Sequence, residues 1–246
     1  MRNELIKKIR SWQFNPGVLG IFVNPFYLAR KALWKEISAS SSMLFGNLLD
    51  VGCGTMPYRK LFAVASYTGL EYDTVIARSR KIADAYYDGN RFPFDDQSFD
   101  SLLCNQVLEH VFTPDKFVSE LARVIKPGGR LLLTVPFIWD EHEQPYDFAR
   151  YTSFGLKAIL ERNGFKVLEQ HRLLDNASVL FQLLNAYLFK VFNSKSLILK
   201  LATRILIFAP ISMLGVLAAV LLPSNSDMFL DQLVIAERQN VNFVKD

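Results

Sequence analysis

The chain has 246 residues, of which half are apolar and 21% are charged, so it can build a core and is not disordered. Its net charge of +4, with no dense Lys/Arg tract interleaved with aromatics, argues against a nucleic-acid partner. Two cysteines, Cys53 and Cys104, are too few for a disulfide framework and match no zinc spacing. We therefore predict a reducing compartment and no metal site. The basic N-terminus lacks the apolar core of a signal peptide, which predicts a cytoplasmic location.

The predicted elements begin with a helical segment over residues 1–46, which we treat as an N-terminal cap. Beyond the linker SASSS, strands and helices alternate. Strands are predicted at 47–52, 66–72, 82–87, 99–105, 130–135, 165–170 and 230–237, and helices over 26–38, from about Pro57, over 114–125, and from Thr152 or Ser153 to about Asn163. This alternation predicts a doubly wound, mostly parallel α/β sheet, in which ligands bind at the carboxyl ends of the strands.

The first strand runs into the glycine-containing turn DVGCGTMPY, residues 50–58. Gly52 and Gly54 allow the backbone to approach a ligand closely because neither carries a Cβ atom. A plain tight turn is the alternative. Pro57 stands where a dinucleotide-binding fingerprint needs its third glycine, which disfavours a nicotinamide cofactor.

Acidic residues follow at the ends of the next two predicted strands. Glu71 ends the second strand and can accept hydrogen bonds from both hydroxyls of a ribose, with Asp73 as the competing residue. Asp88 ends the third strand and can accept a hydrogen bond from an adenine amino group. Each acid alone is more often a solvated loop carboxylate, but the set at these spacings favours a nucleoside-containing ligand.

Taken together, LLDVGCG, GLE, FPFDDQSFD, LEHV and RVIKPGGRLLLTVP resemble a class I S-adenosylmethionine-dependent methyltransferase of the type 11-like subgroup, over about residues 47–170. The resemblance implies a Rossmann-like seven-stranded sheet with an antiparallel last strand, and S-adenosylmethionine as cofactor. It places Asp50, Gly52 and Gly54 at the methionine part of the cofactor, Glu71 at the ribose, Asp88 with the Gly89 backbone at the adenine, and Asn105 and Gln106 beside the transferred methyl group. The family usually has Asp where this chain has Glu71.

The long loop after the fifth predicted strand, PFIWDEHEQPYDFARYT, is where we expect the acceptor to meet the cofactor. His142 is the leading candidate for a catalytic base because its unperturbed pKa is near neutrality. His110, in LEHV, is the second candidate. Four further residues are candidate acceptor contacts: Trp139, Tyr146, Arg150, which could hold an anionic group, and Tyr151. A salt-bridge cluster of Arg150 with Asp147 is the alternative.

Residues 172–226 form an apolar insertion between the last two strands of the core, which we assign to residues 47–171 and 227–240. Its 177–226 portion contains only positive charges, as expected for contact with an anionic membrane surface. A single membrane span is excluded, because the flanking strands belong to one sheet. We favour a surface-lying or half-inserted helical pair, with Pro210 breaking the second helix. A soluble lid or dimer interface, or a two-span hairpin, are the alternatives.

These features predict an enzyme that methylates a small-molecule, lipid-linked, glycan or other amphiphilic acceptor, through oxygen, as a peripheral protein at the inner face of the membrane. The resemblance also implies an association with bacterial cell-surface glycan synthesis. A catalytically idle cofactor-binding domain that binds a partner is the alternative. A nicotinamide-dependent oxidoreductase is disfavoured by Pro57. Assembly as a homodimer is left open.

Overall fold

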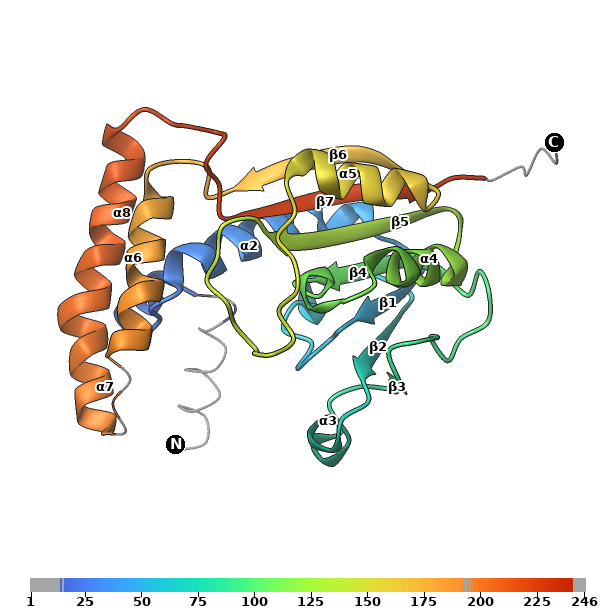
Figure 1. The fold of residues 1–246 in the computed structure, drawn as a ribbon, viewed down its shortest axis with the longest axis horizontal. Coiled ribbons are helices and arrows are strands. Elements are labelled where there is room, and N and C mark those ends of the chain that lie inside the picture. Colours follow the sequence, from blue (N-terminus) through green and yellow to red (C-terminus); the bar gives the residue numbers. More distant parts are fainter. Residues whose placement is uncertain (1–13, 15, 193, 195, 241–246) are drawn as a thin grey trace. The chain divides into compact units, whose positions relative to one another are not determined.

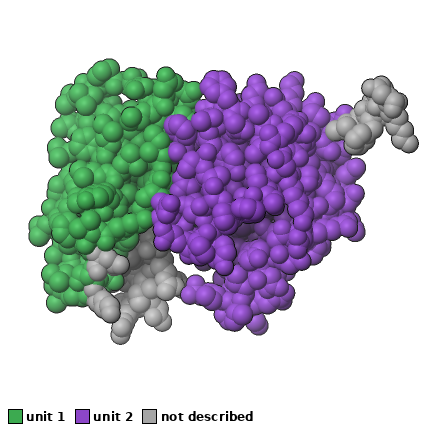
Figure 2. Space-filling model, viewed as in Figure 1, with its two compact units in different colours: residues 1–36, 138–140, 172–231 green, residues 37–137, 141–171, 232–246 purple. Residues whose placement is uncertain are grey.

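The computed structural model describes residues 14, 16–192, 194 and 196–240 and divides the chain into two compact units (Figure 2). The first unit comprises residues 1–36, 138–140 and 172–231, and the second comprises residues 37–137, 141–171 and 232–246. The strands are β1 (Asn47–Val51), β2 (Ser66–Tyr72), β3 (Ala85–Tyr87), β4 (Phe99–Asn105), β5 (Ile125–Pro136), β6 (Phe165–Leu173) and β7 (Asp231–Arg238). The α-helices are α2 (Tyr27–Ser40), α3 (Val75–Arg80), α4 (Pro114–Val124), α5 (Ser153–Arg162), α6 (Ser178–Val191), α7 (Leu197–Thr203) and α8 (Ala209–Leu221).

The strands form one sheet in the order β3-β2-β1-β4-β5-β7-β6 (Figure 1). The pairs from β3 to β5 are parallel, and β7 runs against its neighbours. The predicted seven-stranded sheet with an antiparallel last strand is therefore confirmed. The strand order reverses between β1 and β4, which makes their carboxyl ends the expected ligand-binding edge.

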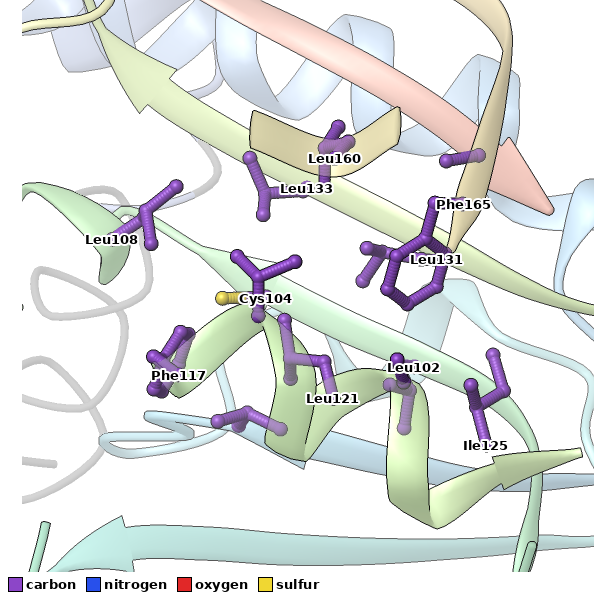
Figure 3. Close-up of a cluster of buried hydrophobic side chains, with 14 of the residues drawn as sticks. Leu102, Cys104, Leu108, Phe117, Leu121, Ile125, Leu131, Leu133, Leu160 and Phe165 are labelled. Carbon is purple, nitrogen blue, oxygen red and sulfur yellow. The ribbon is translucent and has the colours of Figure 1, made fainter. Parts of the chain in front are cut away.

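The core of the second unit explains why the central strands read as continuous apolar runs. Leu102 and Cys104 of β4, and Leu131 and Leu133 of β5, belong to one buried cluster with side chains of α4 and α5 (Figure 3). Leu103 and Leu132, between them in sequence, are equally buried. Both faces of these strands are thus covered, as a parallel sheet between helices requires.

The helix predicted from about Pro57 is wrong, because only a short 3-10 turn, Arg59–Leu61, forms there. The backbone becomes extended at Phe62 (φ −103°, ψ 119°), directly after this turn, so no longer helix continues. The ring of Tyr58 is fully buried and anchors the turn. The loop after β1 therefore remains irregular until the 3-10 turn begins.

The first unit is held together by polar side chains buried between apolar helices. Asn185 of α6 donates hydrogen bonds to the Ser212 hydroxyl and to the Phe208 carbonyl, at 2.9 and 3.3 Å. Gln182 of α6 accepts a hydrogen bond from Ala29 N–H at 3.2 Å and donates one to the Pro25 carbonyl. The sequence treats residues 1–46 and 172–226 as separate pieces. The structure places most of both in one unit, and Gln182 is a physical link between them.

The helix from Leu197 to Leu221 is continuous, so the predicted break at Pro210 is wrong. A π-helical segment, Arg204–Phe208, immediately precedes the proline. Such a segment widens the helix and leaves room for a ring that lacks an N–H group. Among the described residues this is the one helix long and apolar enough, by length and composition, to cross a membrane, and 22% of its most apolar window is buried.

Candidate functional site

The loop after β1 turns through two glycines with positive φ, Gly52 at +69° and Gly54 at +50°. A Cβ atom on Gly52 would lie 2.4 Å from Cγ2 of Val107, so a side chain there would collide with the segment that follows β4. A Cβ atom on Gly54 would meet no atom within 4 Å. The loop therefore approaches the neighbouring strand closely at one glycine and leaves open space at the other.

Glu71, at the end of β2, is bonded to this loop. Its carboxylate accepts hydrogen bonds from the N–H groups of Gly54 and Tyr72, at 2.7 and 3.0 Å. The competing acid, Asp73, forms a two-point ion pair with Arg78, and this hydrogen bonding lowers the pKa of Asp73. The geometry thus favours Glu71 as the acid that faces a ligand on the glycine loop.

Asp50, in β1, is buried and accepts a 2.6 Å hydrogen bond from the Tyr67 hydroxyl. Burial raises the pKa of Asp50 to about 7, against the opposing effect of the Tyr67 hydrogen bond and with a smaller contribution from the charge of Glu71. Its carboxyl group therefore changes charge close to neutrality. Asp50 supports the loop from inside the protein.

Asp88 and Gly89 follow the end of β3. The Asp88 carboxylate is exposed and accepts hydrogen bonds from the backbone N–H and side-chain amide of Asn90, which lowers the pKa of Asp88. Gly89 has a φ of +87°, and a Cβ atom there would lie 3.0 Å from the ring of Tyr72. Since Tyr72 ends β2, these residues lie beside the end of the strand that carries Glu71.

Asn105 and Gln106 lie at the end of β4, next to β5. The Asn105 side-chain oxygen accepts a 2.8 Å hydrogen bond from the Thr134 hydroxyl. Gln106 has a φ of +56°, and its N–H group donates to the Thr134 carbonyl at 3.0 Å. The predicted cofactor residues thus come from the carboxyl ends of β1 to β4, which meet at one edge of the sheet.

Two histidines lie together beyond the same edge. His110 belongs to the 3-10 turn Leu108–His110 after β4, and His142 to the loop after β5. Their ring centroids are 4.8 Å apart and their planes cross at 78°. Nδ1 of His110 lies 2.7 Å from the Tyr146 carbonyl, and Nδ1 of His142 lies 3.2 Å from Oδ2 of Asp147. The two candidate bases of the sequence analysis are therefore neighbours.

Asp147 organises this loop. Its carboxylate is buried, accepts hydrogen bonds from both terminal nitrogens of Arg150 at 2.6 and 2.7 Å, and accepts one from His142 N–H at 3.0 Å. The hydrogen bonds from Arg150, opposed by burial, lower the pKa of Asp147 to about 2. The guanidinium of Arg150 is therefore engaged within the loop, which is the structural role that the sequence left open.

The remaining candidate acceptor contacts differ in burial. Tyr146 is 65% exposed. Tyr151 is buried in the core of the second unit, and burial raises its pKa to about 12, so its ring is a packing residue. Trp139 belongs to the first unit, where its ring packs edge-on against Phe26 with centroids 5.8 Å apart. Of the aromatic candidates, only Tyr146 is exposed in the unit that holds the histidines.

Comparison with known proteins matches residues 49–133 to the family model described as methyltransferase domain. The chain is 29% identical over 167 residues to the O-methyltransferase rstn1 of Aspergillus nomiae, covering 58% of this chain and 74% of that one. Phosphoethanolamine N-methyltransferase 2 of Haemonchus contortus, solved in complex with S-adenosyl-L-methionine, has the same fold, with a TM-score of 0.54 and 18% identity over 95% of this chain and 57% of that one. Residues 49–133 therefore carry a methyltransferase domain, and the chain has the fold of the class I S-adenosylmethionine-dependent methyltransferases.

The fatty-acid O-methyltransferase of Mycolicibacterium smegmatis is also similar to this methyltransferase. The two are 32% identical over 114 residues, which is 42% of this chain and 41% of that one. The shared region is therefore less than half of each protein. The acceptors of such relatives therefore do not transfer directly to this methyltransferase.

The residues at the edge of the sheet fit S-adenosylmethionine. The space over Gly54 is open to a ligand, and the Glu71 carboxylate beside it is an acceptor for ribose hydroxyls. The exposed Asp88 carboxylate has the acceptor oxygens that an adenine amino group would need. The residues predicted to contact the methionine part lie at the ends of β1 and β4 or directly after them. The ends of β2 and β3 thus carry acidic groups suited to the ribose and the adenine of the cofactor.

Sequence reasoning did not single out Tyr67 or Glu109. Tyr67 is a strand residue whose hydroxyl reaches Asp50 from the neighbouring strand, and no local pattern marks that contact. Glu109, in LEHV, is completely buried, and its carbonyl accepts hydrogen bonds from the N–H groups of Phe148 and Ala149. The sequence signal that could have indicated Glu109 is an acidic residue next to a histidine, directly after a predicted strand.

Proposed function

We propose that this methyltransferase methylates an oxygen atom of an amphiphilic acceptor, such as a lipid-linked sugar or a long-chain carboxylic acid, at an anionic membrane surface. The observation that carries the proposal is the exposed apolar surface of α6, α7 and α8, whose only charges are positive. We also propose that the protein is cytoplasmic and binds peripherally to the inner face of the membrane.

The chemistry of an oxygen acceptor suits the histidine cluster. S-adenosylmethionine supplies, when bound, a methyl group on a positively charged sulfur. A hydroxyl becomes a good nucleophile when a base removes its proton. Asp147 faces Nδ1 of His142, so Nε2 of His142 is the nitrogen that accepts the proton, and the Asp147 carboxylate stabilises the resulting imidazolium. Arg150 holds Asp147 in place and keeps it ionised.

The helices of the insertion have the composition of an interfacial segment. Large apolar side chains are more than half exposed along all three: Leu180, Tyr187, Val191, Leu197, Ile198, Leu199, Leu206, Leu214, Leu217, Val220, Leu221 and Leu222. The charged residues from 178 to 222 are Lys190, Lys195, Lys200 and Arg204. Exposed apolar patches of this extent mark interaction surfaces, and cations beside them favour anionic lipid.

The topology favours helices that lie on the membrane over helices that cross it. The strands that flank the insertion, β6 and β7, belong to one sheet, so the chain must return to the side it leaves. A two-span hairpin would require α6 to cross as well. With 14 residues it is about 21 Å long, against roughly 30 Å of hydrocarbon. The surface-lying arrangement satisfies both constraints.

The comparisons support an oxygen-directed reaction and an amphiphilic acceptor. One relative is an O-methyltransferase by name, and another is a fatty-acid O-methyltransferase. A fatty acid has an apolar chain and an anionic oxygen nucleophile, which are the two properties that the apolar helices and the reaction require. An association with bacterial surface glycans, in which the acceptor is a lipid-linked sugar, fits the same surface.

Vesicle flotation tests the membrane part of the proposal. We expect the protein to float with phosphatidylglycerol-containing vesicles and less with pure phosphatidylcholine vesicles. Ile198→Glu on α7 and Val220→Glu on α8, each 80% exposed, should weaken flotation at least tenfold. Phe154→Glu on α5, 81% exposed in the other unit, is the matched control and should float normally. Wild-type protein that stays in the soluble fraction with both kinds of vesicle would contradict the proposal.

Transfer of a labelled methyl group tests the acceptor part. Tritium from the S-adenosylmethionine methyl group should appear in a long-chain fatty acid or a polyprenyl-linked sugar embedded in anionic vesicles. Alkaline hydrolysis should release it as methanol from a methyl ester, whereas a methyl ether should keep it on the sugar after acid hydrolysis of the polyprenyl linkage. Label recovered only in nitrogen-containing lipids would overturn the assignment to oxygen.

A further inference from the structure

Glu109, His110 and His142, which we call the Glu-His-His cluster, bring one carboxylate and two imidazoles together. One potential ligand atom of each residue lies within 4.8 Å of those of the other two. Glu109 and His110 come from the turn after β4, and His142 comes from the loop after β5, 32 residues further along the chain. The cluster is thus a product of the fold, and no spacing in the sequence announces it.

The distances in the cluster are close to those around a bound cation. Two ligand atoms about 2.1 Å from one tetrahedral zinc ion lie about 3.4 Å apart. Nε2 of His110 lies 3.8 Å from Oε1 of Glu109. The three ligand atoms all lie within 4.8 Å of one another, so no pair is more than about 1.4 Å wider than in a zinc site.

Both imidazoles are oriented by groups outside the cluster. A carbonyl oxygen only accepts hydrogen bonds, so Nδ1 of His110, 2.7 Å from the Tyr146 carbonyl, carries the proton. Nδ1 of His142 faces the Asp147 carboxylate at 3.2 Å. In each ring Nε2 is therefore the nitrogen that can bind a metal. Carboxylate and carbonyl partners on the second nitrogen are the usual outer shell of metal-binding histidines.

The third ligand is a carboxylate that the fold removes from water. The Glu109 side chain is completely buried, and the backbone hydrogen bonds from Phe148 and Ala149 to its carbonyl fix the turn against the loop that carries His142. A carboxylate in the interior is stabilised by pairing or by metal coordination. The cluster therefore combines a buried carboxyl group with two oriented imidazoles.

We propose that Glu109, His110 and His142 bind a divalent transition-metal ion, and that zinc is the ion this set fits best. Two histidines and one carboxylate, with a fourth position open, form one of the ligand sets of catalytic zinc sites. The same set also serves non-haem iron, so iron binding is one outcome of the test.

The role of the ion rests on the function proposed above. In the fourth position it binds the acceptor hydroxyl and lowers the pKa of that hydroxyl, whose proton leaves to solvent. The oxygen lone pair then forms the new C–O bond, while the C–S bond breaks and its electron pair stays on sulfur. In the metal-bound protein His142 is a ligand, and the ion takes over the activation of the oxygen from the base.

The experiment is calorimetric titration of untagged, chelator-stripped protein with zinc chloride, without cofactor or acceptor. We expect one zinc per chain, and at least a 100-fold loss of affinity in Glu109→Gln and His142→Ala. His171→Ala is the control, because His171 is paired with Glu169 on β6 outside the cluster, and it should bind zinc as the wild type does. Asp147→Asn should lose 10- to 100-fold, as outer-shell changes do.

Substitution with cobalt(II) gives a second readout, because an ordered low-symmetry site produces visible absorption that His142→Ala should abolish. Equal zinc affinity in wild type, Glu109→Gln and His142→Ala, or no zinc binding, would overturn the site. Tight iron(II) binding with weak zinc binding would overturn the choice of zinc. A site that binds zinc while methyl transfer survives chelation would overturn the role of the ion and leave the proposed methylation standing.

Discussion

Gly54→Ala tests the cofactor assignment with one added methyl group. Gly54 has a φ of +50°, and its added Cβ would meet no atom of the protein within 4 Å. The substitution therefore causes no collision in the protein itself. Gly128, with a φ of +77°, also faces open space, in β5. Gly128→Ala is thus a control with a similar backbone perturbation at a different place.

The backbone conformation sets the expected loss of stability, and the open space over Gly54 sets the expected loss of cofactor affinity. Placing an alanine in the left-handed region costs about 1–2 kcal/mol, so both variants should lose a similar free energy of unfolding. Only at Gly54 does the methyl group enter the space assigned to the cofactor. We expect S-adenosylmethionine to bind at least tenfold more weakly there, a change of about 1.4 kcal/mol or more, and unchanged in Gly128→Ala.

Thermal unfolding measures the loss of stability that the two variants share. Titration calorimetry with S-adenosylmethionine measures the loss of cofactor affinity that we expect only in Gly54→Ala. Refutation would come from Gly54→Ala binding the cofactor as tightly as Gly128→Ala does. In that case the open space over Gly54 would have no part in cofactor binding, and the glycine would serve only the turn.

Three further predictions concern charge and packing. Glu71→Gln should weaken S-adenosylmethionine binding about tenfold by calorimetry, whereas Asp73→Asn, which removes an exposed ion pair, should leave it within twofold; equal losses would contradict the choice of Glu71. Because the pKa of buried Asp50 is raised to about 7, the folded state binds the extra proton between about pH 4 and pH 7, and wild-type stability falls as pH rises through that window. We therefore expect the free energy of unfolding of Asp50→Asn, measured with denaturant, to rise relative to that of the wild type by up to roughly 4 kcal/mol from pH 4 to pH 7. A difference that stays constant with pH would contradict the burial argument. Asn185→Ala should lower the free energy of unfolding by about 1–3 kcal/mol, because it removes the two buried hydrogen bonds that Asn185 donates to the Phe208 carbonyl and the Ser212 hydroxyl; no measurable loss would show that these bonds contribute little.

The strands were the most predictable part of the fold. The predicted bounds of Ser66–Tyr72 and Phe99–Asn105 match β2 and β4 to the residue, and the buried run of β4 reports its place in the sheet directly. The segment after Pro57 was not predictable in this way, since its helical conformation stops after one 3-10 turn, at the extended residue Phe62. The continuous helix through Pro210 depends likewise on a π-helical segment that has no sequence signature.

Contacts between residues far apart in the sequence limit how much of the candidate site can be predicted. The glycine loop and the acids after β2 and β3 are local patterns, so sequence placed them at one edge of the sheet. The pairing of Tyr67 with Asp50 and the assembly of Glu109 with His142 join separate elements, and only the fold brings them together. Gln182 links the insertion to the N-terminal segment in the same non-local manner.

The most direct test of the account is a parallel titration of the wild-type protein with S-adenosylmethionine and with NAD. The glycine loop, Glu71 and Asp88, with Pro57 in place of a third glycine, predict one S-adenosylmethionine bound per chain and no measurable binding of NAD. Binding of NAD without binding of S-adenosylmethionine would contradict the central claim that this edge of the sheet is a methyl-donor site.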